Sequence, residues 1–261
     1  MKRPSRLDYA YAVGRVRVLE KKLVDRAVFS EAAEEKDFPS AMKIVFDSGA
    51  FSEEMIKAKN SEDLDNLIEK EEEELERELD ELLLEKEIFD IFLKEKKPRK
   101  ALAVSKGSDY GFIKDFIKHK IDLANLKIFC RLKYLGAPKE KFEMLSLEGG
   151  FLDVKILLDN FDSPFPEIAD LIQATPYEKL WKKGVDTLEE KETFIDLERG
   201  IEDFLMIYLK KAKHIVFGPE PVFAYGVAKR HELNLVRLLG IGTLSNIPPE
   251  ILKKRISGTY V

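Results

Sequence analysis

Apolar residues recur about every 3.6 positions along almost the whole chain, which is the spacing of amphipathic α-helices. The first apolar stripe predicts a long helix over 9–23, and the next predicts a helix over 40–46 that ends at Gly49. A third stripe predicts a helix over 64–93, whose acidic run 71–74 we expect on an exposed face. The basic segment 94–100, which contains a proline, predicts a linker.

Glycine and proline residues divide the second half of the chain into long and short predicted helices. Long helices are predicted over 109–135 and 194–216, and a further long helix follows Pro221. The breaks between elements lie at 136–138, 149–150, 163–166, 218–221 and 247–250. Because no segment alternates convincingly with a period of two, we predict an all-α protein.

Two stretches of the chain are similar to each other in the same order. Residues 75–84 match 197–206 without gaps, and the shared Leu-Glu-Arg opens both stretches. Upstream, 42–51 match 168–177, and downstream 122–140 match 232–250. Amphipathic helices share a period and so look alike, but collinear blocks with matching prolines favour a duplication. We predict two diverged copies of one helical-bundle unit, 1–149 and 150–261.

Charge and composition narrow the class of protein. The formal net charge is -5, whereas proteins that bind nucleic acid broadly are usually basic. Cys130 is the only cysteine, so no disulfide can form within the chain and a reducing compartment fits best. The first residues lack a signal-peptide pattern, and no run approaches the roughly 18 apolar residues that span a bilayer. We therefore expect a cytoplasmic protein, or one that is peripheral to a larger assembly.

Residues with catalytic or metal-binding potential are scattered. His119, His214 and His231 each stand alone in a helical, charged context, and Cys130 is expected to be a small buried side chain. The chain has no phosphate-binding loop, no His-Glu-x-x-His motif and no Glu-x-x-His pair of the kind that builds a di-metal bundle. We therefore predict no catalytic residue, no cofactor and no metal ion.

Three segments resemble one known family. The stretch Tyr9-Ala10-Tyr11-Ala12-Val13-Gly14-Arg15-Val16-Arg17-Val18-Leu19-Glu20 is similar to the opening of the C subunit of archaeal and vacuolar-type rotary ATPases, which is called the d subunit in eukaryotes. Asp122, Asn125-Leu126-Lys127 and Arg131 resemble the family's motif of an acid, an Asn-Leu pair and an arginine. Residues 218–232 resemble its last repeat, and the closing Tyr260-Val261 also fits. The resemblance covers nearly the whole chain.

The resemblance implies a non-catalytic rotor component without a cofactor. Such a protein lies on the cytoplasmic face of the membrane, on the ring of proteolipid subunits, and receives the lower end of the central shaft formed by subunits D and F. It passes torque between ATP-driven rotation and the transport of protons or sodium ions, and the choice of ion resides in the ring.

The chain also departs from the family pattern. The family normally carries three copies of the helical unit, and this chain has two, so a middle copy is expected to be missing. In the last copy, Leu235 and Ile241 replace the asparagine and the arginine of the motif.

Two groups of residues are candidate partner contacts. The first forms a basic stripe beside the apolar face of the first predicted helix, suited to an acidic partner: Arg15, Lys22 and Arg26. The second lies in the family motif: Asp122, Asn125 and Arg131. An ordinary solvated face is the favoured interpretation of the first group, and capping or bracing of neighbouring helices is the favoured interpretation of the second.

Two other functions are compatible with the sequence. A helical adaptor that lost the rotary role with the middle copy would bridge other proteins and ignore subunits D and F. An enzyme that uses a cleft between the repeats would show a pocket lined by carboxylates with strongly perturbed pKa values, or a bound metal.

Overall fold

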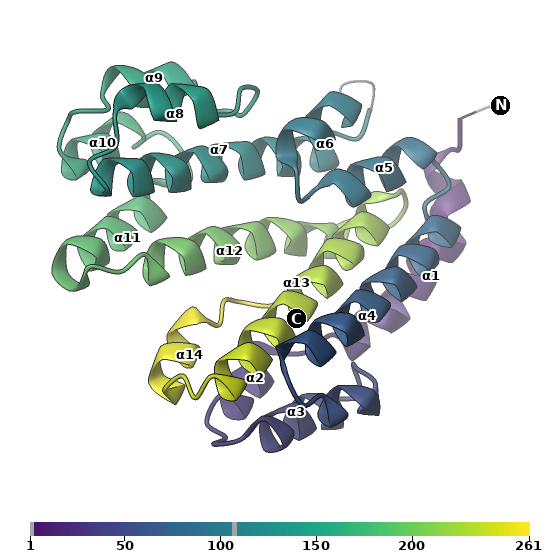
Figure 1. Ribbon diagram of the computed structural model, residues 1–261. Helices are drawn as coiled ribbons and strands as arrows, with labels where there is room; N and C mark the ends of the chain where they lie inside the picture. Colours follow the sequence, from purple (N-terminus) through teal and green to yellow (C-terminus); the bar gives the residue numbers. More distant parts are fainter. Residues whose placement is uncertain (1–2, 106–108) are drawn as a thin grey trace. The chain divides into compact units, whose positions relative to one another are not determined.

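The structure is a computed structural model and describes residues 3–105 and 109–261 (Figure 1). Every regular element within these ranges is a helix, so the predicted all-α class is confirmed. The chain divides into two compact units. Unit 1 combines the residues up to Leu93 with Met206–Val261, and unit 2 consists of Lys94–Leu205. Unit 1 is thus built from both ends of the chain.

The compact units have different boundaries from the predicted sequence copies, 1–149 and 150–261. The copies are defined by similarity along the chain, whereas the units are defined by which residues pack together. The duplication therefore stays a prediction.

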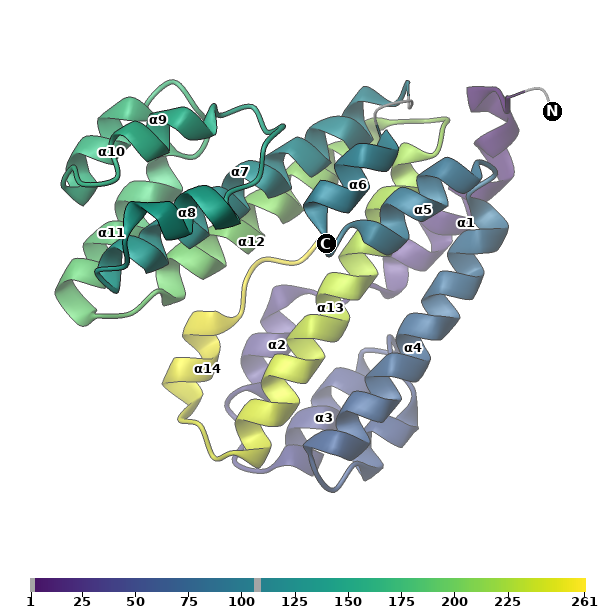
Figure 2. The ribbon, with the colours of Figure 1, turned by 45° about the horizontal axis from the view of Figure 1, so that its top comes forward.

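Unit 1 is organised around two long antiparallel helices, α4 (Ser61–Leu82) and α13 (Glu220–Leu244), which run side by side (Figures 1 and 2). The side chains of Leu64 and Leu79 lie against Gly240 and Gly226 of α13, so the start of α4 meets the end of α13. The remaining elements of unit 1 are η1 (Arg6–Tyr9), α1 (Ala10–Leu19), η2 (Glu20–Lys22), α2 (Arg26–Ala32), α3 (Phe38–Asp47), η3 (Glu53–Lys57), α5 (Lys86–Lys94, its last residue in unit 2), η4 (Lys211–His214) and α14 (Pro249–Arg255).

The apolar stripes predicted from the sequence form the core of unit 1. Phe29 of α2, Met42 of α3, Ile68 of α4 and Leu239 of α13 are all buried in one hydrophobic cluster. Each such side chain contributes about 1.5–3 kcal/mol through removal of its apolar surface from water. The cluster joins helices from both ends of the chain, which explains why the unit is discontinuous in sequence.

Unit 2 is organised around α7 (Gly111–Tyr134), the longest helix in that unit. Phe129 of α7 lies at the centre of an aromatic cluster, with ring centroids 5.3 Å from Phe142, 5.4 Å from Phe161 and 5.9 Å from Trp181. The other elements are α6 (Pro98–Ser105), α8 (Lys139–Leu145), α9 (Val154–Asp159), α10 (Phe165–Leu171), α11 (Glu178–Lys191) and the first part of α12 (Ile195–Lys210), which continues into unit 1.

The two longest helices end in the same way, as their glycine and proline signals predict. Gly136 and Asn246 adopt left-handed backbone conformations, with φ of 62° and 52°. The next residue in each case donates its N–H to a carbonyl five positions earlier, at 2.9 Å in both helices. Pro138 and Pro248 then cap the short helices α8 and α14.

The predicted first helix over 9–23 is wrong at its C-terminal end. The α-helix ends at Leu19, a 3-10 turn follows to Lys22, and Arg26 opens a different helix, α2. The Val24 N–H donates to the buried carboxylate of Glu232 at 2.7 Å, so a distant side chain replaces the intrahelical acceptor. Asp25 then caps α2 by accepting the Ala27 N–H.

Two further boundaries are also corrected. The predicted helix over 64–93 is broken between α4 and α5, where Glu85 is buried and bonded to Arg3 at 2.7 Å. The predicted linker 94–100 is in part helical, because Pro98 is the first residue of α6. Proline is well suited to a first helical position, where its missing N–H costs no intrahelical bond.

Candidate functional site

A buried carboxylate of α7 holds the chain segment that follows α8. Asp122 accepts hydrogen bonds from the N–H groups of Phe151 at 2.9 Å and Leu152 at 3.1 Å, and from the hydroxyl of Tyr177 at 2.8 Å. Burial raises the pKa of Asp122, and these three hydrogen bonds act in the opposite direction. The side chain therefore has the contacts of a structural anchor.

The same segment is held at two more points. Asn125 donates to the Leu147 carbonyl and accepts the Leu147 N–H, both at 2.8 Å. Gly150 allows the close approach of Asp122, because a Cβ at this position would lie 1.8 Å from an oxygen of that carboxylate. Gly150, predicted only as part of a chain break, thus belongs to the anchor.

His119 extends this arrangement by one more hydrogen bond. Its Nδ1 lies 2.6 Å from the Tyr177 hydroxyl oxygen. Because Tyr177 donates its proton to Asp122, His119 acts as the donor in this pair. We call His119, Asp122, Asn125 and Tyr177 the α7 cluster.

A second buried carboxylate, on α13, holds the segment between α1 and α2. Glu232 accepts the Val24 N–H at 2.7 Å, and the Lys229 ammonium lies 3.5 Å from its other oxygen. Lys229 also donates to the Ala50 carbonyl at 2.9 Å and lies 3.8 Å from the centroid of the Phe51 ring. Burial raises the pKa of Glu232 to about 7 and lowers the pKa of Lys229.

His231, next to Glu232, contacts the C-terminal segment of the chain. Its Nε2 lies 3.0 Å from the hydroxyl of Ser257 and 3.1 Å from the carbonyl of Gly258. We call Phe51, Lys229, His231 and Glu232 the α13 cluster. Both clusters tie a non-helical segment to a long helix.

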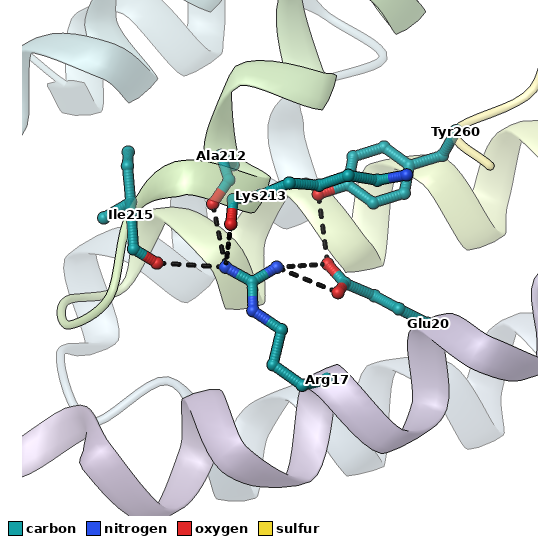
Figure 3. Close-up of polar contacts among 6 residues, drawn as sticks. All are labelled: Arg17, Glu20, Ala212, Lys213, Ile215 and Tyr260. Carbon is teal, nitrogen blue, oxygen red and sulfur yellow. Dashed lines mark hydrogen bonds and ion pairs between the residues drawn. The ribbon is translucent and has the colours of Figure 1, made fainter.

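A third anchor lies on α1 and is drawn in Figure 3. Arg17 donates to the Glu20 carboxylate at 2.8 Å, and Tyr260 donates its hydroxyl to the same carboxylate at 3.0 Å. The Nη2 atom of Arg17 also donates to three main-chain carbonyls at 3.0 Å each, those of Ala212, Lys213 and Ile215. Arg17 thus satisfies carbonyls at the end of η4 and fastens this turn and the C-terminal residues to α1.

The structure separates the members of the predicted basic stripe. Arg15 is bonded to Glu78 of α4 at 3.1 Å, with Glu81 at 3.7 Å. Lys22 and Arg26 are exposed, but they lie on η2 and α2 and do not share one helix with Arg15. The single helical stripe is therefore wrong, because the chain breaks at Leu23–Asp25.

The residues of the predicted motif all have partners within unit 2. Asp122 and Asn125 hold the segment after α8, and Arg131 pairs with Glu198 of α12. The pKa of Glu198 is raised by burial, but Lys127 and Arg131 outweigh that effect and lower it overall. A partner-contact role for these residues stays a prediction.

Sequence reasoning missed Arg17 and the anchoring role of Glu232. The spacing of Arg17 and Glu20 is that of a helical ion pair, but it gives no sign of the three carbonyls contributed from about 200 positions away. Glu232 aligns with Asp122 in the repeat, which is the signal that predicts a matching role. Cys130 is buried as predicted, and burial raises the pKa of its thiol to about 12.

A recess in unit 1 has the composition expected of an enzyme pocket. It has a volume of about 240 Å³ and is lined by Glu71, Glu74, Leu75, Glu78, Tyr225 and Lys229. Its lysine is engaged by Glu232, by the Ala50 carbonyl and by the Phe51 ring. These contacts give Lys229 a packing role.

The described residues offer neither a metal-binding cluster nor a membrane span. Within 3–105 and 109–261, His, Cys, Asp and Glu side chains do not gather in groups of three or more that could hold a metal ion. In the same part of the chain, the helices are too short or too polar to cross a membrane.

Comparison with known proteins gives consistent matches. A family model described as "ATP synthase (C/AC39) subunit" matches residues 47–255. The C subunit of the A-type ATP synthase of Methanococcoides burtonii is 27% identical over 153 residues, which are 58% of this chain and 42% of that protein. The C subunit of the V-type sodium ATPase of Enterococcus hirae is 29% identical over 111 residues, which are 42% of this chain and 33% of that protein.

These matches set the limits of the resemblance. Each of the two alignments with a curated relative covers less than half of that relative's length. The family model includes the α7 motif and the segment 218–232, whereas residues 9–20 and the closing Tyr260-Val261 lie outside it. The match nevertheless extends over most of both compact units, and the chain belongs to the ATP synthase (C/AC39) subunit family.

Proposed function

We propose that this chain is a non-catalytic central-stalk subunit of a V/A-type ATPase or ATP synthase. The observation that carries the proposal is the family match over 47–255. In this role the chain couples the rotating shaft of subunits D and F to the membrane ring of proteolipid subunits. It sits on the cytoplasmic face of the membrane and is held there by the ring.

The internal anchors support a mechanical role. Transmission of torque requires a rigid body, and close-packed helices provide one. The weakest parts of a helical protein are the segments between helices, since these lack a regular hydrogen-bond ladder. Here Asp122, Glu232 and Arg17 fasten such segments to long helices through buried or partly buried hydrogen bonds.

Binding to the purified partners tests this proposal. The full chain is immobilised and exposed separately to the D–F heterodimer and to the detergent-solubilised ring from the same source. We expect both to bind. Failure of both to bind would remove the proposal.

A pair of charge-reversal variants tests whether the predicted basic residues contribute. Lys22→Glu with Arg26→Glu should weaken shaft or ring binding by about tenfold if these residues meet an acidic partner. Lys183→Glu, at an exposed position of α11, is the matched control and should have no effect. Equal affinities for all three proteins would exclude Lys22 and Arg26 as contacts.

A second candidate function is a helical adaptor that no longer takes part in rotation. It is favoured by the short coverage of the relatives, 42% and 33% of their lengths. An adaptor would bind neither the D–F pair nor the ring, and would associate with other proteins instead. The same binding experiment therefore separates the two candidates.

A further inference from the structure

The outer side of the first helical segment carries a line of solvent-exposed apolar residues. Leu7 in η1 and Tyr11 and Val18 in α1 are 65%, 75% and 60% exposed. Gly14 lies between Tyr11 and Val18, and a Cβ at this position would meet nothing within 4 Å. We call Leu7, Tyr11, Gly14 and Val18 the α1 seam. Large apolar residues at regular spacing are unusual on a surface that meets only water.

The spacing of the α1 seam fits a partner helix. Its members follow each other at intervals of four, three and four, which is the pattern of residues that face a second helix in a coiled coil. The stripe is narrow, since Arg15 on one side of it pairs with Glu78 of α4. A helix that lies in a lipid surface usually has a much wider apolar face. Gly14 leaves room in the middle of the seam for a closely packed helix.

The surroundings of the seam are basic. Lys21 and Lys22 are exposed at its C-terminal end, and the exposed Lys211 and Lys213 lie on η4, which Arg17 fastens to α1. Burial is the main cause that lowers the pKa of Lys213; Lys210 and Arg17 lower it further, and Glu20 acts in the opposite direction.

The carboxylates at the two ends of the seam are already engaged, whereas Glu81 of α4, 3.7 Å from Arg15, is exposed. Glu20 accepts hydrogen bonds from Arg17 and Tyr260, and Asp8 accepts the N–H of Ser5. Two more apolar side chains adjoin the seam on the η4 side, Val216 and Phe217, which are 67% and 41% exposed. The Phe217 carbonyl accepts a hydrogen bond from Arg6 at 2.7 Å, which holds this edge next to η1.

We propose that the α1 seam is a docking surface for an acidic amphipathic α-helix of a partner protein. The apolar side of that helix packs on Tyr11 and Val18 across Gly14, and its flanking carboxylates meet Lys21, Lys22 and the lysines of η4. A second copy of this chain packed in parallel would bring lysines against lysines, and charge disfavours that arrangement. This docking surface goes beyond the proposed rotary role, although Lys22 is a candidate contact in both, and its test uses neither the shaft nor the ring.

Two synthetic helical peptides of about 20 residues test the proposal. Both peptides carry leucine at the positions that would face the α1 seam. One peptide has glutamate at every flanking position, and the other has lysine there. Each labelled peptide is titrated with the full chain, and binding is followed by fluorescence anisotropy. We expect the glutamate peptide to bind at least about tenfold more tightly, with an affinity that falls as salt is added.

Two variants locate the binding. Val18→Asp should reduce the affinity for the glutamate peptide by at least about tenfold. Ile207→Asp changes an apolar residue of α12 that is 63% exposed and should have no effect. Circular dichroism melting of each variant checks that the fold is retained, as expected for exposed positions.

Four outcomes would overturn the proposal. Equal affinities of the two peptides would show that charge does not contribute to binding. Equal losses of affinity in Val18→Asp and Ile207→Asp would place the binding site elsewhere. Binding of neither peptide, together with sedimentation of the chain with phosphatidylglycerol vesicles, would identify a lipid-binding surface instead. Binding of neither peptide without such sedimentation would also remove the proposal.

Discussion

The α7 and α13 clusters occupy matching places on the two long helices, but their buried acids are satisfied to different degrees. Asp122 and Glu232 are paired in the internal alignment, at a separation of 110 residues. Each accepts the N–H of the residue that precedes an aspartate helix cap: Leu152 before Asp153 and Val24 before Asp25. The two units thus use the same device to join a long helix to the segment that leads into a capped short helix.

The difference lies in the third partner. Tyr177 gives Asp122 a hydroxyl donor, whereas the aligned Phe51 has none, and the ammonium of Lys229 lies on the Phe51 ring instead. Glu232 therefore has one backbone hydrogen bond and one ion-pair partner, and burial raises its pKa to about 7. Burial raises the pKa of both acids, and at Asp122 the hydroxyl of Tyr177 adds a donor that opposes this effect.

Removal of the better-satisfied acid should have the largest effect. Asp122→Ala leaves two buried N–H groups and the Tyr177 hydroxyl without their acceptor, so we expect a loss of about 3–5 kcal/mol in the free energy of unfolding of unit 2. Trp181 is the only tryptophan and is buried in unit 2, so its fluorescence in urea reports this transition. The exposed Asp162→Ala is the control, and equal midpoints for the two variants would contradict the anchoring role.

Neutralisation of the less satisfied acid should have the opposite sign. The pKa of Glu232 is about 7 in the folded chain against 4.5 for a free glutamate, so the unfolded chain releases the proton first. Stability is therefore lost as the pH rises from 4.5 to 7, by about 3 kcal/mol in total.

Glu232→Gln removes this titration while its amide oxygen can still accept the Val24 N–H. We expect the variant to be more stable than the parent above pH 7 and to show no advantage below pH 4.5, as measured by urea unfolding followed by circular dichroism. Parallel pH profiles for variant and parent would show that Glu232 is not the titrating group.

A smaller loss is expected from Gly150→Ala. The added methyl group would lie 1.8 Å from a carboxylate oxygen of Asp122, so the loop must shift, at a cost of about 1–3 kcal/mol. Gly14→Ala is the matched control, since its added methyl group meets nothing and a helical alanine is favoured by about 0.5–1 kcal/mol. Thermal melting should lower the midpoint of the first variant only; a shift of the same sign in both would argue against the close approach.

The smallest effect is expected when the α7 cluster is made to resemble the α13 cluster. Tyr177→Phe removes one donor from Asp122 and leaves both backbone hydrogen bonds, so a loss of about 1 kcal/mol is expected. Trp181 fluorescence measures it as before. If Tyr177→Phe lost as much free energy of unfolding as Asp122→Ala, the hydroxyl and not the two backbone hydrogen bonds would account for the stabilisation by Asp122.

The sequence was sufficient to predict the helical class and the ends of several long helices. Apolar periodicity locates α7 and α13, and the signals around Gly136, Pro138 and Pro248 mark real helix ends, because these residues act through local backbone geometry. The break after Lys22 could not be predicted in the same way. It depends on the bond between Val24 and Glu232, which joins residues 208 positions apart.

The candidate residues show the same difference between local signals and contacts made by distant parts of the chain. Asp122 and Asn125 were found through a motif, although their role as loop anchors becomes visible only when Leu147 and Leu152 are seen beside α7. Arg15, chosen for its charge, is occupied by Glu78, whereas its neighbour Arg17 holds three carbonyls of a distant turn. Charge along a helix does not reveal which cation is turned toward the protein.

The coupling of ATP hydrolysis to ion transport tests the central claim most directly. The rotary complex is reconstituted into vesicles with the chain, without it, and with Arg17→Met, which releases η4 from α1. We predict that hydrolysis continues in all three preparations, that transport is lost without the chain, and that the variant transports fewer ions per ATP. Undiminished transport in the preparation that lacks the chain would contradict the proposed function.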